Sequence, residues 1–342
     1  MGARALVLCG LAAISIAGGT ARADEPPAPV TRGPATRGPA TRGPAAAATE
    51  AAARGAPAGD LDGSFEGVEV EAPDDERGPI AEVSGGVEVW GAYFDRGFLV
   101  EAAAFVVQPW IAVDVPLLRC AGAVDDVRFV ADGFASLEDG ETGLGGGPHA
   151  PKGWYEADVW LGLASHVRER LDVRLDYQLS WSPNGSFERF EELALQLDYD
   201  DEATFASRGG RFRGFAPTML LACETRGQND DGRHLGRYLE LRAEPRWACC
   251  GEGEPALDLS VPVRLGLSVG DYYEDADGRD ETFGFVAVGV RLAVGLGRLS
   301  RPLDDWTATA TVGGIWLGDH AAEAGDGRRS RLVTAFGLAW EP

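Results

Sequence analysis

Long runs in which apolar residues alternate with polar or small ones most restrict how this chain can fold. Between Leu171 and Trp181 every odd position is apolar and every even position is Asp, Arg, Gln or Ser. Similar runs cover 257–269, 286–296 and 332–340. Because successive side chains of a strand point to opposite faces, each run predicts a strand with one apolar face. At about eleven to thirteen residues, these strands exceed the usual soluble length and suit a tilted crossing of a membrane.

Twelve such segments can be placed along the chain, an even number typical of single-chain bacterial barrels. They lie near 84–94, 106–117, 127–137, 154–165, 171–182, 187–199, 216–224, 237–247, 256–268, 283–296, 306–317 and 331–340. The pattern predicts an all-β fold, an antiparallel transmembrane β-barrel of about 12 strands over 84–342. A soluble β-protein with its apolar face inward is the alternative, because alternation alone does not give the direction of that face.

The connections between these segments differ in length in the way that such a barrel requires. If the first strand runs outward, the outer connections are long and acidic and most inner ones are short, as expected of this class. The outer set includes 138–153, 225–236, 270–282 and 319–330, and the inner set 118–126, 166–170, 248–255 and 297–305. A tight outer turn at 183–186 and a long inner connection at 200–215 are exceptions.

The first 80 residues have a different composition from the rest. Residues 1–23 carry Arg4, an apolar stretch too short to span a bilayer and an Ala21-Arg22-Ala23 cleavage site, which together predict a cleaved signal peptide. Residues 24–80, rich in Pro, Ala and Gly, are expected to form a disordered periplasmic tether. Its arginines suggest contact with the cell wall, although a plain spacer is the simpler interpretation. The predicted location is the outer membrane of a Gram-negative-type bacterium.

The charge balance and the motifs argue against several classes of function. With 31 Lys+Arg against 54 Asp+Glu, nucleic acid is a poor partner. The four histidines occur in no metalloprotease spacing, and hydrolase and nucleotide-binding motifs are absent, so no enzyme and no cofactor is expected. A barrel hydrolase using His166 and a nearby serine is a remote alternative. The acidic segments 229–232 and 275–281 resemble parts of calcium loops but lack the full spacing, so no metal site is expected.

The polar faces of the strands are the remaining candidates for a function. A charge facing lipid at mid-membrane costs about 2–4 kcal/mol, so these faces are expected to point inward. Carboxylates outnumber arginines among them, which favours cations. The expected pore-lining residues are Gln108, Asp114, Glu156, Asp158, Asp172, Arg174, Asp176, Gln178, Glu240, Arg242, Glu244, Asp258, Arg264 and Arg291.

Several short motifs together resemble a known family. They are Tyr93-Phe94-Asp95-Arg96-Gly97-Phe98, Gln108-Pro109, Trp154-Tyr155-Glu156-Ala157-Asp158, Ser182-Pro183-Asn184-Gly185-Ser186-Phe187, Glu191-Glu192-Leu193, Val261-Pro262 and Tyr272-Tyr273-Glu274. Over about residues 84–342 the chain resembles the TorF-type porin group of bacterial outer-membrane β-barrels. The resemblance implies a barrel and suggests a channel, and it brings no catalytic residues.

The expected function is a small outer-membrane channel that passes small, cation-biased solutes, with membrane lipid and those solutes as partners. In the main alternative, Arg174, Arg242, Arg264 and Arg291 pair with carboxylates and close the interior, which leaves a structural barrel without transport. The cysteines Cys120, Cys223, Cys249 and Cys250 leave disulfide pairing open, because connectivity does not follow from sequence.

Overall fold

The computed structural model describes residues 81–102, 105–120, 122–138, 153–206, 211–229, 232–249, 257–275, 277–297 and 300–342. The expected signal peptide (1–23), the tether (24–80) and its cell-wall contact lie outside the described residues. Within them, every helix is too short or too polar to cross a membrane.

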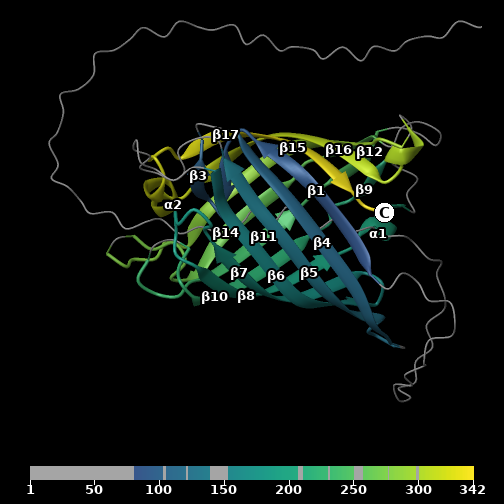
Figure 1. The fold of residues 1–342 in the computed structure, drawn as a ribbon, viewed down its shortest axis with the longest axis horizontal. Helices are drawn as coiled ribbons and strands as arrows, with labels where there is room; N and C mark the ends of the chain where they lie inside the picture. Colours follow the sequence, from purple (N-terminus) through teal and green to yellow (C-terminus); the bar gives the residue numbers. More distant parts are fainter. Residues whose placement is uncertain are drawn as a thin grey trace, which may run out of the picture. The chain divides into compact units, whose positions relative to one another are not determined.

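Twelve strand positions form a closed antiparallel barrel in the described part of the chain (Figure 1). Consecutive strands pair with one another around the wall, and β1 pairs with β17 to close it. The positions are held by β1 (Glu82–Trp90), β4 (Val106–Arg119), β5 (Asp126–Glu138), β6 (Gly153–Val167), β7 (Leu171–Trp181), β8 (Phe190–Tyr199), β10 (Thr218–Arg226), β11 (Arg237–Ala243), β14 (Val263–Gly270), β15 (Phe283–Gly295), β16 (Trp306–Leu317) and β17 (Ser330–Trp340). The predicted all-β barrel of about 12 strands is confirmed.

Three wall positions are interrupted near one end of the barrel. The short strands β9 (Phe212–Gly214), β12 (Arg246–Ala248) and β13 (Leu257–Ser260) continue β10, β11 and β14, and they pair with one another and with β15. Each gap contains a proline: Pro217, Pro245 or Pro262. Because proline has no N–H to donate to the ladder, it breaks the strand at these points.

The outer face of the wall is apolar. Leu161, Leu163, Leu175, Val290 and Phe336 are among the large apolar side chains with at least 39% of their surface exposed. They belong to the apolar set of each alternating run, whereas the polar set is mostly buried or half-buried. The direction left open by the alternation is therefore resolved: the apolar side chains point out of the barrel.

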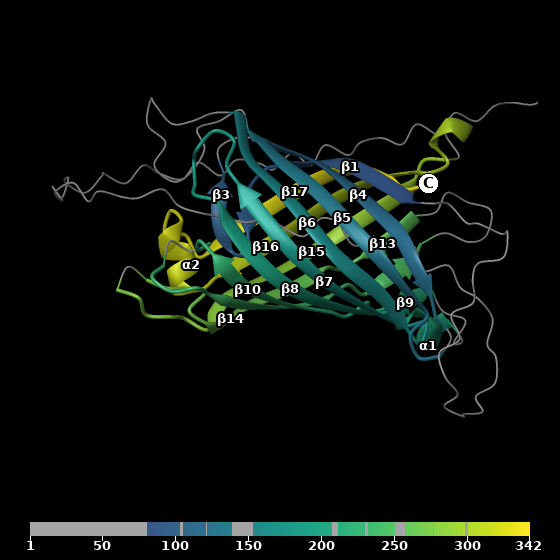
Figure 2. The same ribbon diagram turned by 60° about the horizontal axis from the view of Figure 1, so that its bottom comes forward.

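The two ends of the barrel differ as expected. β1 begins and β17 ends at the same end, and β6 and β7 are joined there by residues 168–170 alone (Figures 1 and 2). The long connection at 200–215, which also lies at this end, contains α1 (Glu202–Ala206) and β9. The connection between β15 and β16 contains the 3-10 helix η1 (Arg301–Leu303). The opposite end carries longer connections, one of which contains α2 (Asp319–Ala324).

The expectation of one continuous strand over 84–94 is wrong. β1 stops at Trp90, where the Gly91 amide bonds the Thr334 carbonyl, and a small hairpin follows, β2 (Tyr93–Asp95) and β3 (Phe98–Glu101). Tyr93 and Phe94 suit an extension of β1 as well as a separate short strand, so the sequence did not separate the two. Tyr93 and Phe94 of the hairpin and Tyr155 of β6 are buried inside.

Candidate functional site: the inward hairpin and the charged inner wall

The β2–β3 hairpin lies inside the barrel at the end opposite the termini of the wall. Every residue from Tyr93 to Glu101, including the two turn residues, is buried. Its two-residue turn is Arg96-Gly97, with φ of 41° and 92°. Two positive φ values make the tight turn whose twist suits a hairpin. Glycine accepts this conformation freely, whereas arginine does so at a cost of about 1–2 kcal/mol.

Arg96 fastens the hairpin tip to the wall. Its Nη1 and Nη2 donate to the two carboxylate oxygens of Glu192 on β8, at 2.5 and 2.6 Å, and both side chains are buried. Nη1 also donates to the Tyr272 hydroxyl at 2.9 Å, and the guanidinium lies 4.8 Å from the centre of the Tyr238 ring. A planar guanidinium matches a carboxylate at two points, which fixes direction as well as distance. This pairing explains why arginine occupies a strained turn position.

An aromatic cluster surrounds one face of the hairpin. Phe98 packs near Tyr272 and Tyr273, and the Tyr273 hydroxyl donates to the Arg96 carbonyl at 2.8 Å. Tyr273 fits because Gly284 lies beneath it; a side chain there would overlap its ring. Ala321 and Ala322 of α2 join the same buried cluster. The loops at this end therefore close over the hairpin.

The other face of the hairpin meets the opposite part of the wall. Tyr93 and Val100 belong to a second buried cluster with Phe134, Tyr155 and Phe190. The Tyr93 hydroxyl donates to Glu156 on β6 at 3.1 Å. With contacts to β6, β8, β11 and β15, the hairpin reaches across the lumen at this end of the barrel.

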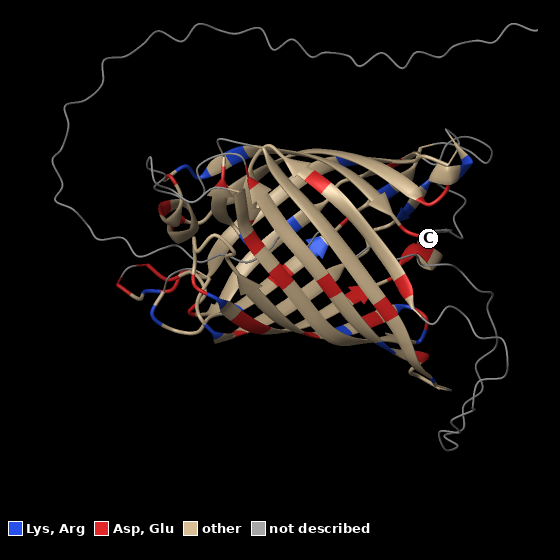
Figure 3. Cartoon of the chain, viewed as in Figure 1, with Lys and Arg blue, Asp and Glu red and all other residues tan. Residues whose placement is uncertain are grey.

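The wall strands toward the other end carry many charged residues (Figure 3), and several of their side chains stay partly exposed. Arg128 on β5 bonds Asp114 on β4 at 2.6 Å and Asp172 on β7 at 3.0 Å, and Asp172 remains 29% exposed. Arg174 pairs with Asp132 and Asp176. These partners lie on the same strand or within two strands of each other. The arginines thus follow the wall and do not bridge the lumen.

The expected pore-lining residues fall into two groups. Gln108, Glu156, Asp158, Asp176, Gln178 and Glu240 are buried. The remaining eight are half-buried or exposed, and they are Asp114, Asp172, Arg174, Arg242, Glu244, Asp258, Arg264 and Arg291. The four arginines of the closed-barrel alternative all pair with carboxylates. Arg174 meets Asp132 and Asp176, Arg264 bonds Glu240 at two points, Arg242 also meets Glu240, and Arg291 lies 3.8 Å from Glu244. Whether this face carries solute stays a prediction.

The sequence does not single out the residues that hold the hairpin, because Arg96 and Glu192 occur only as parts of the family-like motifs. Arg128 and Asp132 of the charged wall are also absent from the expected pore-lining residues. A signal was present, since the motifs around 93–98, 108, 154–158, 187, 192 and 272–274 all supply residues to the hairpin or its surroundings. Their shared role is to pack one buried element.

His166 and Ser165 do not form a catalytic pair. Ser165 donates to the Asp126 carbonyl at 2.7 Å, and the His166 ring lies 3.7 Å from Asp172. The neighbours in sequence point to opposite faces of β6. This arrangement gives Ser165 a backbone partner instead of a base.

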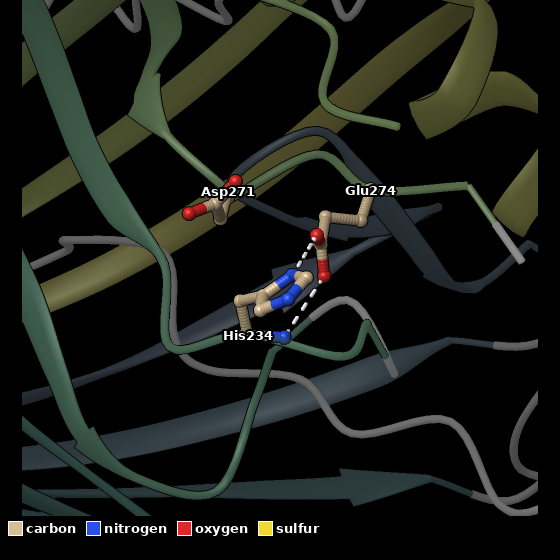
Figure 4. Close-up of side chains that lie close together, drawn as sticks. All are labelled: His234, Asp271 and Glu274. Carbon is tan, nitrogen blue, oxygen red and sulfur yellow. Dashed lines mark hydrogen bonds and ion pairs between the residues drawn. The ribbon is translucent and has the colours of Figure 1, made fainter. Parts of the chain in front are cut away.

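His234, Asp271 and Glu274 form a small group in two loops at the hairpin end (Figure 4). Glu274 accepts from the His234 ring at 2.6 Å and from the amides of Arg233 and His234. The bond to Glu274 raises the pKa of His234. Burial tends to raise the pKa of Glu274, but these hydrogen bonds outweigh burial and lower it. The group acts as a clamp between the loops, because its carboxylate is already engaged.

The acidic segment 275–281 is a hydrogen-bonded turn in its described part: Asp275 accepts from the amides of Asp277 and Arg279 at 2.9 Å. Cys120, Cys223 and Cys249 are free thiols. Cys250, His149 and residues 230–231 lie outside the described residues.

No family model matches the chain, and no curated protein matches it. Among solved structures, an outer membrane channel from Pseudomonas putida F1 has a TM-score of 0.44 at 11% identity, covering 80% of this chain and 99% of its own. The NanC porin has a TM-score of 0.40 at 9% identity, covering 77% and 100%. The β domain of the Bordetella autotransporter BrkA has the same TM-score and identity, covering 77% and 99%. The resemblance to the TorF-type group stays a prediction.

Proposed function

We propose that this protein is a small outer-membrane channel for small solutes, with a preference for cations, and that the β2–β3 hairpin restricts passage through it. The membrane placement is supported by the apolar outer face, because an exposed apolar surface of this extent suits lipid better than water. Strand closure supports it too, since a closed barrel satisfies every ladder without an edge.

The observation that carries the channel proposal is the contrast between the two halves of the lumen. One half is lined by Asp114, Arg128, Asp172 and their neighbours, whose charges pair along the wall and keep partial exposure. The other half holds a separate element, the hairpin, with end loops packed on it. A passage therefore needs the hairpin and these loops to shift, whereas the wall can stay in place.

Conductance in planar lipid bilayers tests this proposal. The wild-type protein is compared with a variant in which 93–101 is replaced by a short Gly-Ser linker. A small unit conductance for the wild type and a several-fold larger one for the variant are expected. Heat-modifiability on gels verifies that both are folded barrels.

A second candidate, a barrel permanently closed by the hairpin, is favoured by the complete burial of that element. It predicts no wild-type conductance at any voltage and conductance in the linker variant. If neither protein conducts, the lumen is not the passage and the channel proposal is wrong.

A further inference from the structure

Between the hairpin and strands β4 to β6 lies a group of buried polar side chains with unpaired polar atoms. Both amide atoms of Gln108, the Ser136 hydroxyl and one oxygen of Glu156 have no hydrogen-bond partner among the described residues. Asp158 lies beside them and interacts with the Ser180 hydroxyl on the paired strand β7. All four side chains are at most 1% exposed. Buried polar groups are nearly always satisfied, so a concentration of this kind calls for a specific reason.

Strand register brings these side chains together on the inner face. Ser136 pairs with Glu156. On the other side of β5, the β4–β5 pairs Val107–Leu137 and Trp110–Phe134 put Gln108 opposite Ser136. Asp158 follows Glu156 on the same face of β6, and paired positions of neighbouring strands have Cβ atoms about 4.5–5.5 Å apart. An amide, a hydroxyl and two carboxylates therefore form one continuous group.

Negative charge accumulates around this group. Asp95 of the hairpin and Glu138 of β5 act on Glu156, in addition to Asp158. Arg96 lies near Asp158, but its two terminal nitrogens bond Glu192. The Tyr93 hydroxyl donates to one oxygen of Glu156, and the other oxygen has no hydrogen-bond partner among the described residues. Two buried carboxylates close together repel each other unless a positive charge lies between them.

Protonation of the carboxylates explains only part of this arrangement. It would remove the charge, but the amide of Gln108 would still have no partner within bonding geometry. A cation held between the oxygens would neutralise the carboxylates and coordinate the Gln108 carbonyl oxygen at the same time. The donors are all oxygens, the ligands preferred by hard cations such as Ca²⁺.

We propose that Gln108, Ser136, Glu156 and Asp158 form a buried Ca²⁺-type cation site in the wall beside the hairpin, whose Tyr93 hydroxyl bonds the Glu156 ligand. The charge of the two carboxylates balances a divalent ion. Ca²⁺ fits better than Mg²⁺, which usually keeps several waters, because these oxygens have almost no exposed surface at which water could be retained. The site does not depend on whether the barrel conducts.

Calcium titration of the EDTA-treated full-length protein in detergent tests the proposal, by thermal unfolding and by calorimetry. One Ca²⁺ per chain and a rise in Tm are expected for the wild type, with Mg²⁺ giving a much smaller rise. Glu156→Gln and Asp158→Asn should lose the response, while their metal-free Tm stays equal or rises because repulsion is relieved. Gln108→Leu, which leaves the charge unchanged, should weaken binding at least tenfold.

Two control variants make the result specific. Asp132→Asn removes an inward carboxylate that pairs with Arg174, and Asp271→Asn alters the exposed loop group; both should keep the calcium response. No binding to the wild type overturns the proposal. So does a response lost in Asp271→Asn and kept in Asp158→Asn, which would place the ion in the loops.

Discussion

The guanidinium of Arg96 and the carboxylate of Glu192 meet at two points inside the barrel, 96 residues apart in sequence. Removing one partner of a buried pair leaves the other charge uncompensated, at a cost of about 3–5 kcal/mol. Arg96→Ala and Glu192→Gln should therefore both loosen the hairpin.

We expect these two variants to lower the urea midpoint of unfolding and to increase conductance or open-state flicker. The matched control is Glu191→Gln, which alters the neighbouring carboxylate on the outer face, where it pairs with Arg189. Unchanged conductance in both Arg96→Ala and Glu192→Gln would show that the pair does not hold the hairpin closed.

Gly284 lies directly under the Tyr273 ring, and an added methyl group would overlap that ring. Overpacking of this kind costs about 1–3 kcal/mol. Gly284→Ala should lower the thermal midpoint and displace the tyrosine from the Arg96 carbonyl. In Gly133→Ala the new methyl would approach an Ile111 methyl at 3.3 Å, so a smaller change is expected. Equal effects of the two substitutions would contradict this packing.

The charges along the wall predict opposite changes in ion selectivity. Arg128 neutralises Asp114 and Asp172, so Arg128→Gln should release two carboxylates and increase cation preference. Asp172→Asn or Asp258→Asn should reduce it. Reversal potentials in a KCl gradient measure both effects. Shifts of the same sign for Arg128→Gln and Asp172→Asn would refute a passage along this wall.

The His234–Glu274 clamp predicts a dependence on pH. The raised pKa of His234 means that its contribution is complete below the ordinary histidine value of 6.5 and is lost as the pH rises through the raised value. The lowered pKa of Glu274 means that its contribution is present above 4.5 and is lost as the pH falls through the lowered value. The clamp is therefore tightest in weakly acidic solution.

An NMR titration of the His234 ring should give a midpoint above 6.5, and Glu274→Gln should lower it. Asp277→Asn, in the same loop, is the control and should leave the midpoint nearly unchanged. A wild-type midpoint at or below 6.5 would contradict the clamp.

The barrel could be predicted because its wall follows from local rules. Alternation gave the strands, and connection length gave the relative sizes of the two ends, including the long connection at 200–215. The hairpin could not be predicted, since its short strands suit a continuation of β1 equally well in the sequence. Its inward course depends on contacts with Glu192 and Tyr273, far along the chain, that no local pattern contains.

The inner face was predictable in position but not in pairing. Asp172 and Arg174 were expected to point inward from the period alone. The pairing of Arg128 with Asp114 and Asp172 depends on the register between β4, β5 and β7. A slip of one residue would turn the side chains of the shifted strand toward lipid.

The hairpin leaves β1 after only Gly91 and Ala92, yet its tip bonds Tyr273, 177 residues later. Contacts of such long sequence separation form slowly, because much of the chain must be ordered before they bring any stability. The partner loop between β14 and β15 is also among the last parts of the barrel to be made. The hairpin, which is the first connection between wall strands, can therefore dock only after this loop has formed. We expect that the hairpin inserts and that β1 pairs with β17 in one late kinetic step of assembly.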